Sequence, residues 1–298
     1  MTMSSPGSDL QQAAAWLRAA DGLLITAGAG MGIDSGLPDF RGPGGFWAAY
    51  PALGRARIAF ESIANPAAFA SDPALAWGFY GHRLDLYRRT EPHAGFRLLL
   101  GMAAQKPHGA WVFTSNVDGQ FQRAGFAEAS VVECHGSIHH LQCLERCSEA
   151  IWSAEALTPE IDAENCRMKS DLPRCPHCGG LARPAILMFN DWDWAAERTG
   201  MQMARLREWQ ARVQRPVTVE IGAGSAIATV RAFAQGLGAP IIRINPSEWQ
   251  VTHLGDVGIA VGALEGIRGI TSVRHANMIR ETVCCNFGLN GSTPTPSQ

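Results

Sequence analysis

The stretch at residues 23–41, LLITAGAGMGIDSGLPDFR, decides the fold, because a short apolar run breaks into a glycine-rich turn. A strand that enters such a turn presents backbone N–H groups without bulky Cβ atoms. Gly28, Gly30 and Gly32 would therefore let a pyrophosphate lie close to the chain. The same glycine pattern is also typical of an ordinary flexible turn. The acid, aromatic ring and guanidinium at residues 39–41 favour the nucleotide site.

Length, charge and cysteine content limit the class of protein. The 298 residues can form one large domain with an insert, or two modest domains. A net charge of −2 with scattered arginines does not predict a nucleic-acid partner, which requires a basic face. No segment approaches the ~18 apolar residues of a membrane span, and the N-terminus lacks signal-peptide features. We therefore expect a cytoplasmic protein without a membrane partner, and a monomer. In the reducing cytoplasm, eight cysteines favour metal ligands or free thiols over a framework of disulfides.

The segments that flank the glycine turn differ in periodicity. Ser8 and Asp9 are typical of a helix N-cap, apolar residues follow at helical spacing, and Gly22 ends the pattern. Helix, strand and glycine loop are the opening of a nucleotide-binding fold. Residues 42–73 are rich in Gly, Pro, Ala and aromatic residues with weak periodicity. This segment is predicted to be mobile and to close over a ligand, with an ordinary surface connection as the alternative.

Residues 73–89 have the spacing of a helix, with an apolar stripe. Tyr80 and Arg83 lie three positions apart on it, so both side chains can point into one pocket. A guanidinium offers a bidentate fork to a carboxylate, and a phenol adds one more donor. A solvated or structural pair is the alternative interpretation.

Polar residues follow the next two predicted strands, at residues 110–113 and 131–133. Asn116 and Asp118 come after the first strand and His135 after the second. Ligands of doubly wound sheets bind outside the carboxyl ends of the strands, where these residues fall. His135, with an unperturbed pKa near 6.5, can accept a proton at neutral pH and is the predicted catalytic base. A core or surface histidine is the alternative.

Two cysteine pairs predict a metal site. One has the spacing C-x3-C and the other C-x2-C, with 27 residues between the pairs. Tetrahedral zinc takes four thiolates, and each close pair supplies two of them. Cys166 lies between the pairs and is the one substitute ligand. With no catalytic group beside them, the four thiolates predict one structural zinc, held by Cys143, Cys147, Cys175 and Cys178.

The second half of the chain contains further strand and loop patterns. Strands are predicted at 217–221 and 241–245, an amphipathic helix at 201–215, and a last helix from Gly262. The segment LARPAILMFND at residues 181–191 precedes Trp192 and Trp194, which we expect to pack. Beyond about residue 270 the sequence loses periodicity, which predicts a poorly ordered tail.

Five of these motifs resemble, in order, those of the sirtuins, the NAD-dependent protein deacylases. GAGMGIDSGLPDFR resembles GAG-x-S-x-x-SGIPDFR, TSNVDGQFQRAG resembles T-Q-N-I-D-x-L-H-x-x-AG, and ECHGSI resembles E-x-HG-s-i. LARPAILMFND resembles L-x-RP-x-VVWFGE, and Gly222-Ala223-Gly224-Ser225 with Asn245 resembles the G-t-S-L loop and the I-N strand end. The resemblance spans roughly residues 10–270. Departures are Gly32 for Ser, Ser115 for Gln, Phe121 for His and Asn190-Asp191 for Gly-Glu.

The resemblance implies an α/β fold with a doubly wound, Rossmann-like parallel sheet that binds NAD. The sheet domain would comprise residues 8–137 and 186–270, with a zinc-binding module at 138–185 and a tail at 271–298. The reaction would remove acetyl, and by the Tyr80 and Arg83 pair succinyl or malonyl, groups from protein lysines. Nicotinamide and O-acyl-ADP-ribose would be released.

Carried over residue by residue, the resemblance implies the site. The catalytic residues would be His135, Asn116 and Asp118. Asn116 would bind ribose or order water, and Asp118 would hold the nicotinamide carboxamide. Tyr80 and Arg83 would line the acyl pocket, and the backbone around Phe189 would pair with the acyl-lysine peptide by strand addition. The NAD-binding residues would be Gly28, Ala29, Gly30, Asp39, Phe40, Arg41, Ser115, Asn116, Asp118, Gly222, Gly224, Ser225 and Asn245.

Two other functions fit parts of the same sequence. The departures at Ser115 and Phe121 leave a mono-ADP-ribosyltransferase or an NAD glycohydrolase as an alternative on the same site. The paired cysteines alone would suffice for a non-catalytic zinc-ribbon binding protein. That protein would release no nicotinamide, and His135 together with Asp118 argues against it.

Overall fold

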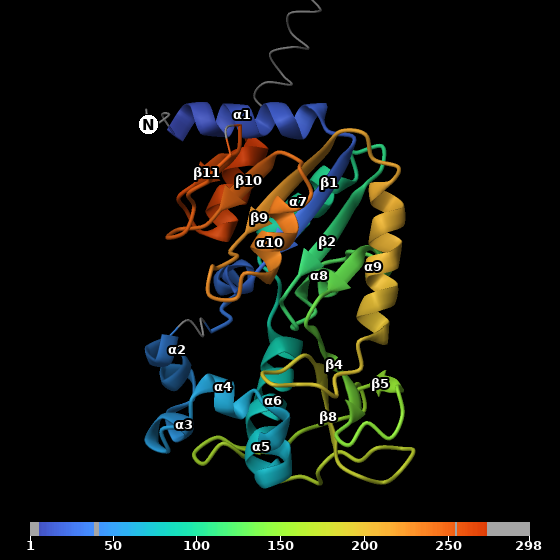
Figure 1. Ribbon diagram of the computed structural model, residues 1–298. Helices are drawn as coiled ribbons and strands as arrows, with labels where there is room; N and C mark the ends of the chain where they lie inside the picture. The colour runs from blue at the N-terminus through green and yellow to red at the C-terminus, as the bar shows by residue number, and fades with distance from the viewer. Residues whose placement is uncertain (1–5, 39–41, 254, 273–298) are drawn as a thin grey trace, which may run out of the picture.

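The computed structural model describes residues 6–38, 42–253 and 255–272. Its largest sheet has six strands in the order β11-β10-β9-β1-β2-β3, and every neighbouring pair is parallel (Figure 1). The chain order reverses beside β1, which is the doubly wound topology predicted from the sequence. The strands are β1 Gly22–Ala27, β2 Ala110–Thr114, β3 Val131–Glu133, β9 Pro216–Ile221, β10 Ile241–Ile244 and β11 Val257–Ile259.

Helices cover both faces of this sheet. All six positions of β1 are buried, as expected for a parallel strand between two helical layers. Leu23 and Ile25 pack in the core beneath α1 and α7, whereas Leu24 packs in the core beneath α9 and α10. The helices are α1 Pro6–Ala19, α7 Ala94–Ala103, α8 Gln120–Arg123, α9 Glu197–Gln210 and α10 Thr229–Gln235, with the 3-10 turns η1 Ala29–Ser35 and η2 Glu128–Ser130 and a further helix at 263–272.

A second layer of helices lies outside the carboxyl end of the sheet (Figure 1). Most of residues 42–73 are helical, which the weak periodicity of this segment did not predict, and its closing over a ligand stays a prediction. Its helices have only four to eight residues, too few for a period to repeat. Aromatic rings fix them instead: Phe46 and Phe60 pack edge-on to Phe79, and Phe69 to Trp77. The helices are α2 Gly42–Ala49, α3 Pro51–Arg55, α4 Phe60–Ile63, α5 Pro66–Ser71 and α6 Pro73–Arg89.

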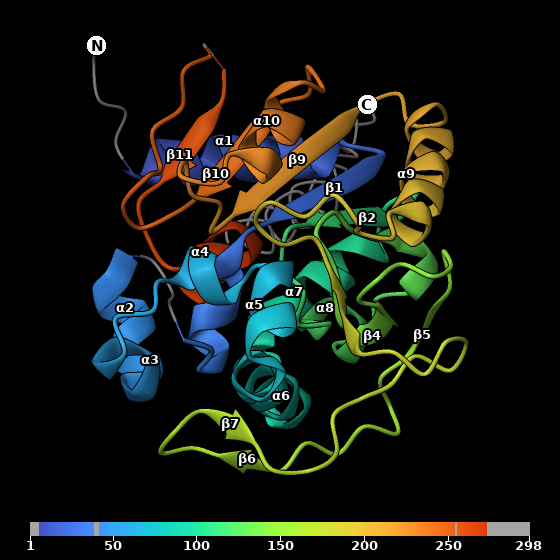
Figure 2. The same cartoon turned by 60° about the horizontal axis from the view of Figure 1, so that its bottom comes forward.

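The cysteine pairs belong to a small antiparallel sheet with the order β5-β4-β8. The strands are β4 Gly136–Cys143, β5 Ile151–Ser153 and β8 Ala182–Ile186. The chain enters this sheet at Gly136, where φ is +77° and an added Cβ would lie 2.0 Å from the Ala185 oxygen, so only glycine fits. Between the pairs the chain forms a hairpin, β6 Ile161–Asp162 and β7 Arg167–Met168, which lies along α6 (Figure 2). The predicted domain limits stay a prediction.

Helix limits differ from the sequence patterns at two places. α1 begins at Pro6, since proline suits the first position of a helix, and Asp9 lies in its first turn and not at its N-cap. α9 begins at Glu197, four residues before the predicted start, and ends at Gln210. Among the described residues, no helix is both long and apolar enough to cross a membrane.

Candidate functional site

The loops that follow β1 and β9 meet at the carboxyl edge of the sheet. Gly28 N–H donates to the Ile221 oxygen, and Gly30 N–H donates to the Gly222 oxygen, both over 3.0 Å. A Cβ at Gly28 would lie 2.8 Å from Ala223 Cα, and one at Gly30 would lie 2.6 Å from Gly222 Cα. In this structure the two glycines are therefore required first by contact between the loops. The predicted phosphate contact stays a prediction.

The rim of these loops is open. Ala29 and Ser225 are exposed, and Gly30 and Gly224 are partly exposed. Neither loop, at residues 28–33 or 222–227, carries an acidic side chain of its own, and the Glu248 carboxylate beside Gly224 is paired with Arg231. This rim therefore suits a diphosphate, which backbone N–H groups can bind without charge repulsion. Three further predicted contacts lie outside the described residues, namely Asp39, Phe40 and Arg41.

Asn116 fastens the loop after β2 to the loop after β1. Its Nδ2 donates to the Gly28 oxygen over 3.0 Å, and its own N–H donates to Thr114 Oγ1 over 3.0 Å. The Ser115 N–H donates to the Ala27 oxygen over 3.2 Å. The amide of Asn116 is therefore held at the strand ends, beside the glycine loop, as the sequence predicted.

Asp118 is partly buried two residues further on. Its Oδ1 accepts the Gln120 N–H over 2.9 Å, and its backbone oxygen lies 2.9 Å from His139 Nε2. Desolvation raises the pKa of Asp118 to about 6; the Glu133 charge adds to the rise, and the Arg83 charge opposes it. His139, which was expected to be only structural, thus supports the loop of Asp118, whose ionised form is destabilised by burial.

Asp118→Asn is expected to stabilise the chain in a pH-dependent way. The pKa of Asp118 is raised from 3.8 to about 6, so its ionised form destabilises the folded state above that pH. The cost shrinks as the pH falls below about 6, and it disappears only about one unit below 3.8, where the carboxyl is protonated in folded and unfolded chains alike. Thermal unfolding should give the variant a higher Tm than the parent at pH 8 and a nearly equal one at about pH 3. Exposed Asp85→Asn is the control, and a lower Tm for Asp118→Asn at pH 8 would contradict the interpretation.

His135 joins β3 to β4 at the same edge of the sheet. Its backbone oxygen accepts the Leu187 N–H over 2.9 Å, which fixes the main chain. The residue is partly buried, and this burial lowers the pKa of its imidazole. The ring is therefore neutral at pH 7, which is the form that a general base requires.

Asn245 has a different environment from the one predicted. The residue is 1% exposed, and its Nδ2 donates to the Ala223 oxygen over 3.0 Å. Its Oδ1 accepts the N–H groups of Ser247 and Glu248 over 3.0 and 2.9 Å. In this structure Asn245 ties the loop after β9 to the loop after β10, and its contact with ribose stays a prediction.

Tyr80 and Arg83 lie on α6 with 1% and 8% exposure, so a solvated pair is excluded, whereas a purely structural pair stays open as the alternative. Tyr80 stacks on Phe69 with ring centroids 5.5 Å apart. The Arg83 charge acts on the pKa of Asp118, which means that the guanidinium lies near the carboxyl edge of the sheet. Sequence reasoning missed Tyr87, which contacts Arg83; its spacing of four residues along the helix was the available signal.

The segment around Phe189 is anchored by a buried ion pair. Arg183 and Asp191 are joined by two hydrogen bonds of 2.8 and 2.7 Å, and both side chains are 0% exposed. Asp191 Oδ2 also accepts the Met188 N–H, and the Phe189 N–H donates to the Ala64 oxygen. These N–H groups are used within the chain, so strand addition by a peptide stays a prediction. The expectation that Trp192 packs is wrong: it is 89% exposed, whereas Trp194 is partly buried.

The four predicted zinc ligands converge. Their sulfur atoms all lie within 4.8 Å of one another, with Cys143 and Cys178 separated by 3.7 Å and Cys147 and Cys175 by 3.6 Å. A tetrahedral site with Zn–S bonds of about 2.3 Å places sulfur atoms about 3.8 Å apart. The donor set therefore fits zinc. Cys166, the substitute ligand, is not part of this cluster and is buried in the core beside α6.

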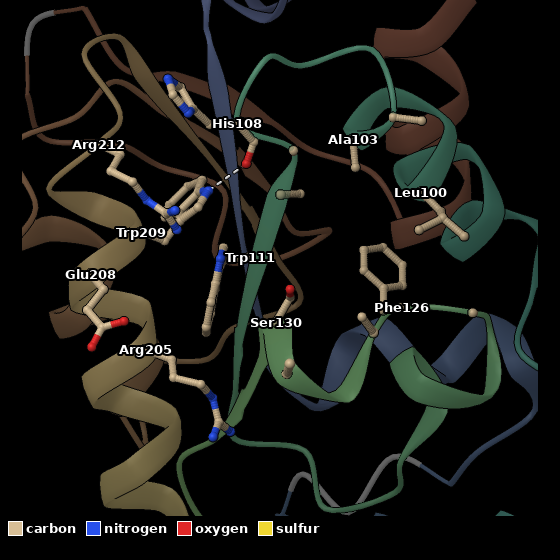
Figure 3. Close-up of a pocket in the computed structure, with 16 residues that line it drawn as sticks. Leu100, Ala103, His108, Trp111, Phe126, Ser130, Arg205, Glu208, Trp209 and Arg212 are labelled. Carbon is tan, nitrogen blue, oxygen red and sulfur yellow. Dashed lines mark hydrogen bonds between the residues drawn. The ribbon is translucent and has the colours of Figure 1, made fainter.

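A cavity of about 630 Å³ lies away from all these residues (Figure 3). Leu100 from α7, Trp111 from β2 and Arg205 from α9 line it, and the Trp209 Nε1 donates to the His108 oxygen at its side over 2.6 Å. Residues 108–111 begin β2, so this cavity is at the amino end of the sheet. Ligands of doubly wound sheets bind at the opposite, carboxyl end.

Comparisons with known proteins agree with this geometry. The family model described as the Sir2 family matches residues 28–205. An NAD-dependent protein deacylase 1 of Pseudomonas aeruginosa is 32% identical over 236 residues, which cover 78% of this chain and 85% of the relative. An NAD-dependent protein deacylase of Aquifex aeolicus is 29% identical over 251 residues, which cover 83% and 93%. The crystal structure of a Sir2 homolog–NAD complex matches with a TM-score of 0.66 and 25% identity, covering 92% of this chain and 95% of that one.

Proposed function

The chain belongs to the Sir2 family, and on this premise we propose that it removes acyl groups from protein lysines at the expense of NAD. The observation that carries the proposal is the meeting of Asn116, Asp118 and His135 with the two glycine loops at one sheet edge. The relatives named as NAD-dependent protein deacylases support the reaction. The two glycine loops carry no acidic side chain of their own and fit NAD, and the four thiolates fit a structural zinc.

The residues have separate tasks in this proposal. NAD, as the bound substrate, supplies a ribose whose bond to nicotinamide is broken. Asp118 holds the nicotinamide carboxamide, and Asn116, fixed by Gly28, orients the ribose or a water. His135, kept neutral by burial, accepts a proton from a ribose hydroxyl at an imidazole nitrogen. The zinc thiolates hold the small sheet together and have no step in the chemistry.

The proposal is tested with an acetyl-lysine peptide and the purified chain, with and without NAD. Mass spectrometry should show loss of the acetyl group only when NAD is present, with release of nicotinamide. A zinc-ribbon binding protein would release no nicotinamide under any condition. Acetyl loss without NAD, or no loss of acetyl, succinyl or malonyl groups from matching peptides in its presence, would contradict the proposal.

We further propose that the acyl pocket prefers an acidic acyl group, such as succinyl or malonyl. The support is the burial of Tyr80 and Arg83 side by side on α6, near Asp118. A guanidinium shielded from water binds a carboxylate more strongly than it would at the surface. An acetyl group offers no carboxylate and gains nothing from this contact.

Arg83→Met is expected to lower kcat/KM on a succinyl-lysine peptide by about ten- to a hundredfold, because a hydrogen bond to a charged group contributes roughly 1.5–3 kcal/mol. Methionine keeps much of the apolar volume on α6, so kcat/KM on the matching acetyl-lysine peptide should change little. Steady-state kinetics on the two peptides measures both values. Equal losses on both peptides, or no succinyl activity in the parent chain, would limit the function to deacetylation.

A further inference from the structure

Arg83 is surrounded by aromatic rings of its own helix. Its Cζ lies 5.2 Å from the ring centroid of Phe79, 5.7 Å from that of Tyr80 and 5.3 Å from that of Tyr87. All three rings are buried, so little water reaches the guanidinium. Ring faces attract a cation but leave its rotation about the long side chain undetermined. Orientation must therefore come from directional contacts.

Tyr87 supplies such contacts. Its hydroxyl oxygen accepts hydrogen bonds from Arg83 Nε over 3.0 Å and from Arg83 Nη2 over 2.7 Å. These two donors form the side edge of the planar guanidinium. A carboxylate that binds in a bidentate manner can use either the side edge or the end edge formed by Nη1 and Nη2. Tyr87 occupies the side edge and thereby fixes the plane of the guanidinium.

We infer that Tyr87 is a positioning residue for acyl recognition: its two hydrogen bonds fix the plane of the Arg83 guanidinium, which contacts the carboxylate of an acidic acyl group. This inference rests on the proposed acidic-acyl preference. Tyr87 does not touch the acyl group and acts through Arg83. It extends the predicted pocket pair to three residues, at positions 80, 83 and 87 of one helix.

The protonation states support this arrangement. Burial raises the pKa of Tyr87, so its hydroxyl stays neutral and keeps its acceptor lone pairs. Burial alone would lower the pKa of Arg83, but the surrounding Tyr87, Tyr80 and Tyr50 phenols raise it overall. The guanidinium therefore stays charged, and the bond to Tyr87 does not change over the working pH range.

The helix that carries the three residues is held at both ends by the segment between the cysteine pairs. At its start, Asp72 accepts two hydrogen bonds from Arg167, of 2.7 and 2.8 Å. At its end, Arg88 donates to the backbone oxygens of Leu157 and Ala154, both over 2.6 Å. The hairpin of β6 and β7 lies along the helix between these points (Figure 2).

Two glycines allow this close approach. A Cβ at Gly78 would lie 1.9 Å from the Cys166 oxygen, and one at Gly81 would lie 2.9 Å from Ile161 Cδ1. The unusual length of the insert between the cysteine pairs thus has a structural use. It packs along α6 and holds both ends of the helix that carries Arg83 and Tyr87.

The test is a double-mutant cycle on Tyr87→Phe and Arg83→Met, with succinyl-lysine and acetyl-lysine peptides. Phenylalanine keeps the ring and removes the hydroxyl. Tyr87→Phe should raise KM for the succinyl peptide about tenfold, leave its kcat within about twofold, and leave both constants for the acetyl peptide unchanged. In the Arg83→Met background the same change should have no further effect, because its target is gone.

Thr90→Val is the matched control, since it removes a part-buried hydroxyl at the end of the same helix, where Thr90 Oγ1 donates to the Leu86 oxygen over 2.7 Å. It should leave KM for the succinyl peptide unchanged. Equal losses on both peptides in Tyr87→Phe, no loss, or full additivity with Arg83→Met would overturn the inference alone. A parent chain without succinyl activity would overturn the acyl preference and this inference together. The assay of the parent chain shows this result before any variant is made, so the two failures are told apart.

Discussion

His135→Ala is expected to lower kcat/KM for an acetyl-lysine peptide by ~10²–10⁴-fold, which is the usual contribution of one general base. Burial lowers the pKa of the His135 imidazole, so the native ring is ready to accept a proton at pH 7. Alanine cannot accept it. The main chain is fixed by the hydrogen bond from Leu187 to the His135 oxygen, which the variant keeps, so Tm and zinc content should match the parent.

His108→Ala is the control for this experiment. His108 is exposed and lies at the amino end of β2, on the edge of the sheet opposite His135. Its side-chain loss should leave kcat/KM unchanged. If a folded His135→Ala chain keeps near-parent turnover, another group is the base and the assignment of His135 is wrong.

Cys175→Ser is expected to remove zinc and to lower Tm by about 5–10 °C. Losing one of the four thiolates opens the tetrahedral shell and withdraws metal-binding energy from folding. Cys143 ends β4, and the loop of Cys175 and Cys178 precedes β8. Without the metal, these two strands of the small sheet are no longer linked at that point. Deacylation should fall as well, because the segment between the cysteine pairs is hydrogen-bonded to both ends of α6.

Metal analysis and thermal unfolding measure both effects. Cys166→Ser is the matched control, since Cys166 lies in the same insert but outside the sulfur cluster. It should keep one zinc per chain. A Cys175→Ser chain that keeps both full zinc and the parent Tm would show that this thiolate is not a ligand.

Much of the fold follows from short patterns in the sequence. The strands that became β1 and β2 are apolar runs that end in glycine or in polar residues, as expected for buried parallel strands, whereas β9 and β10 each also carry a buried charge, Glu220 and Arg243, which pair with each other. The cysteine spacing likewise predicts the sulfur cluster, because ligands two to four residues apart must lie on one turn.

Other features depend on contacts between distant segments, which local patterns do not contain. The helices at residues 42–73 form because their aromatic rings pack on α6, and their own periodicity is too short to predict them. Asn245 follows a predicted strand, but the partner of its side chain, the backbone oxygen of Ala223, lies in a distant loop that the local pattern does not reveal. Trp192 is 89% exposed because the Arg183–Asp191 pair holds the preceding turn, and a tryptophan at that position would otherwise be expected to pack.

The most direct test of the account is product analysis of one reaction, in which the parent chain is given NAD and an acyl-lysine peptide. Mass spectrometry should find one nicotinamide and one O-acyl-ADP-ribose for every lysine that is freed. ADP-ribosylated protein, or free ADP-ribose beside an intact acyl-lysine, would instead assign the site to ADP-ribosyl transfer or NAD hydrolysis. Either result would contradict deacylation as the function of this chain.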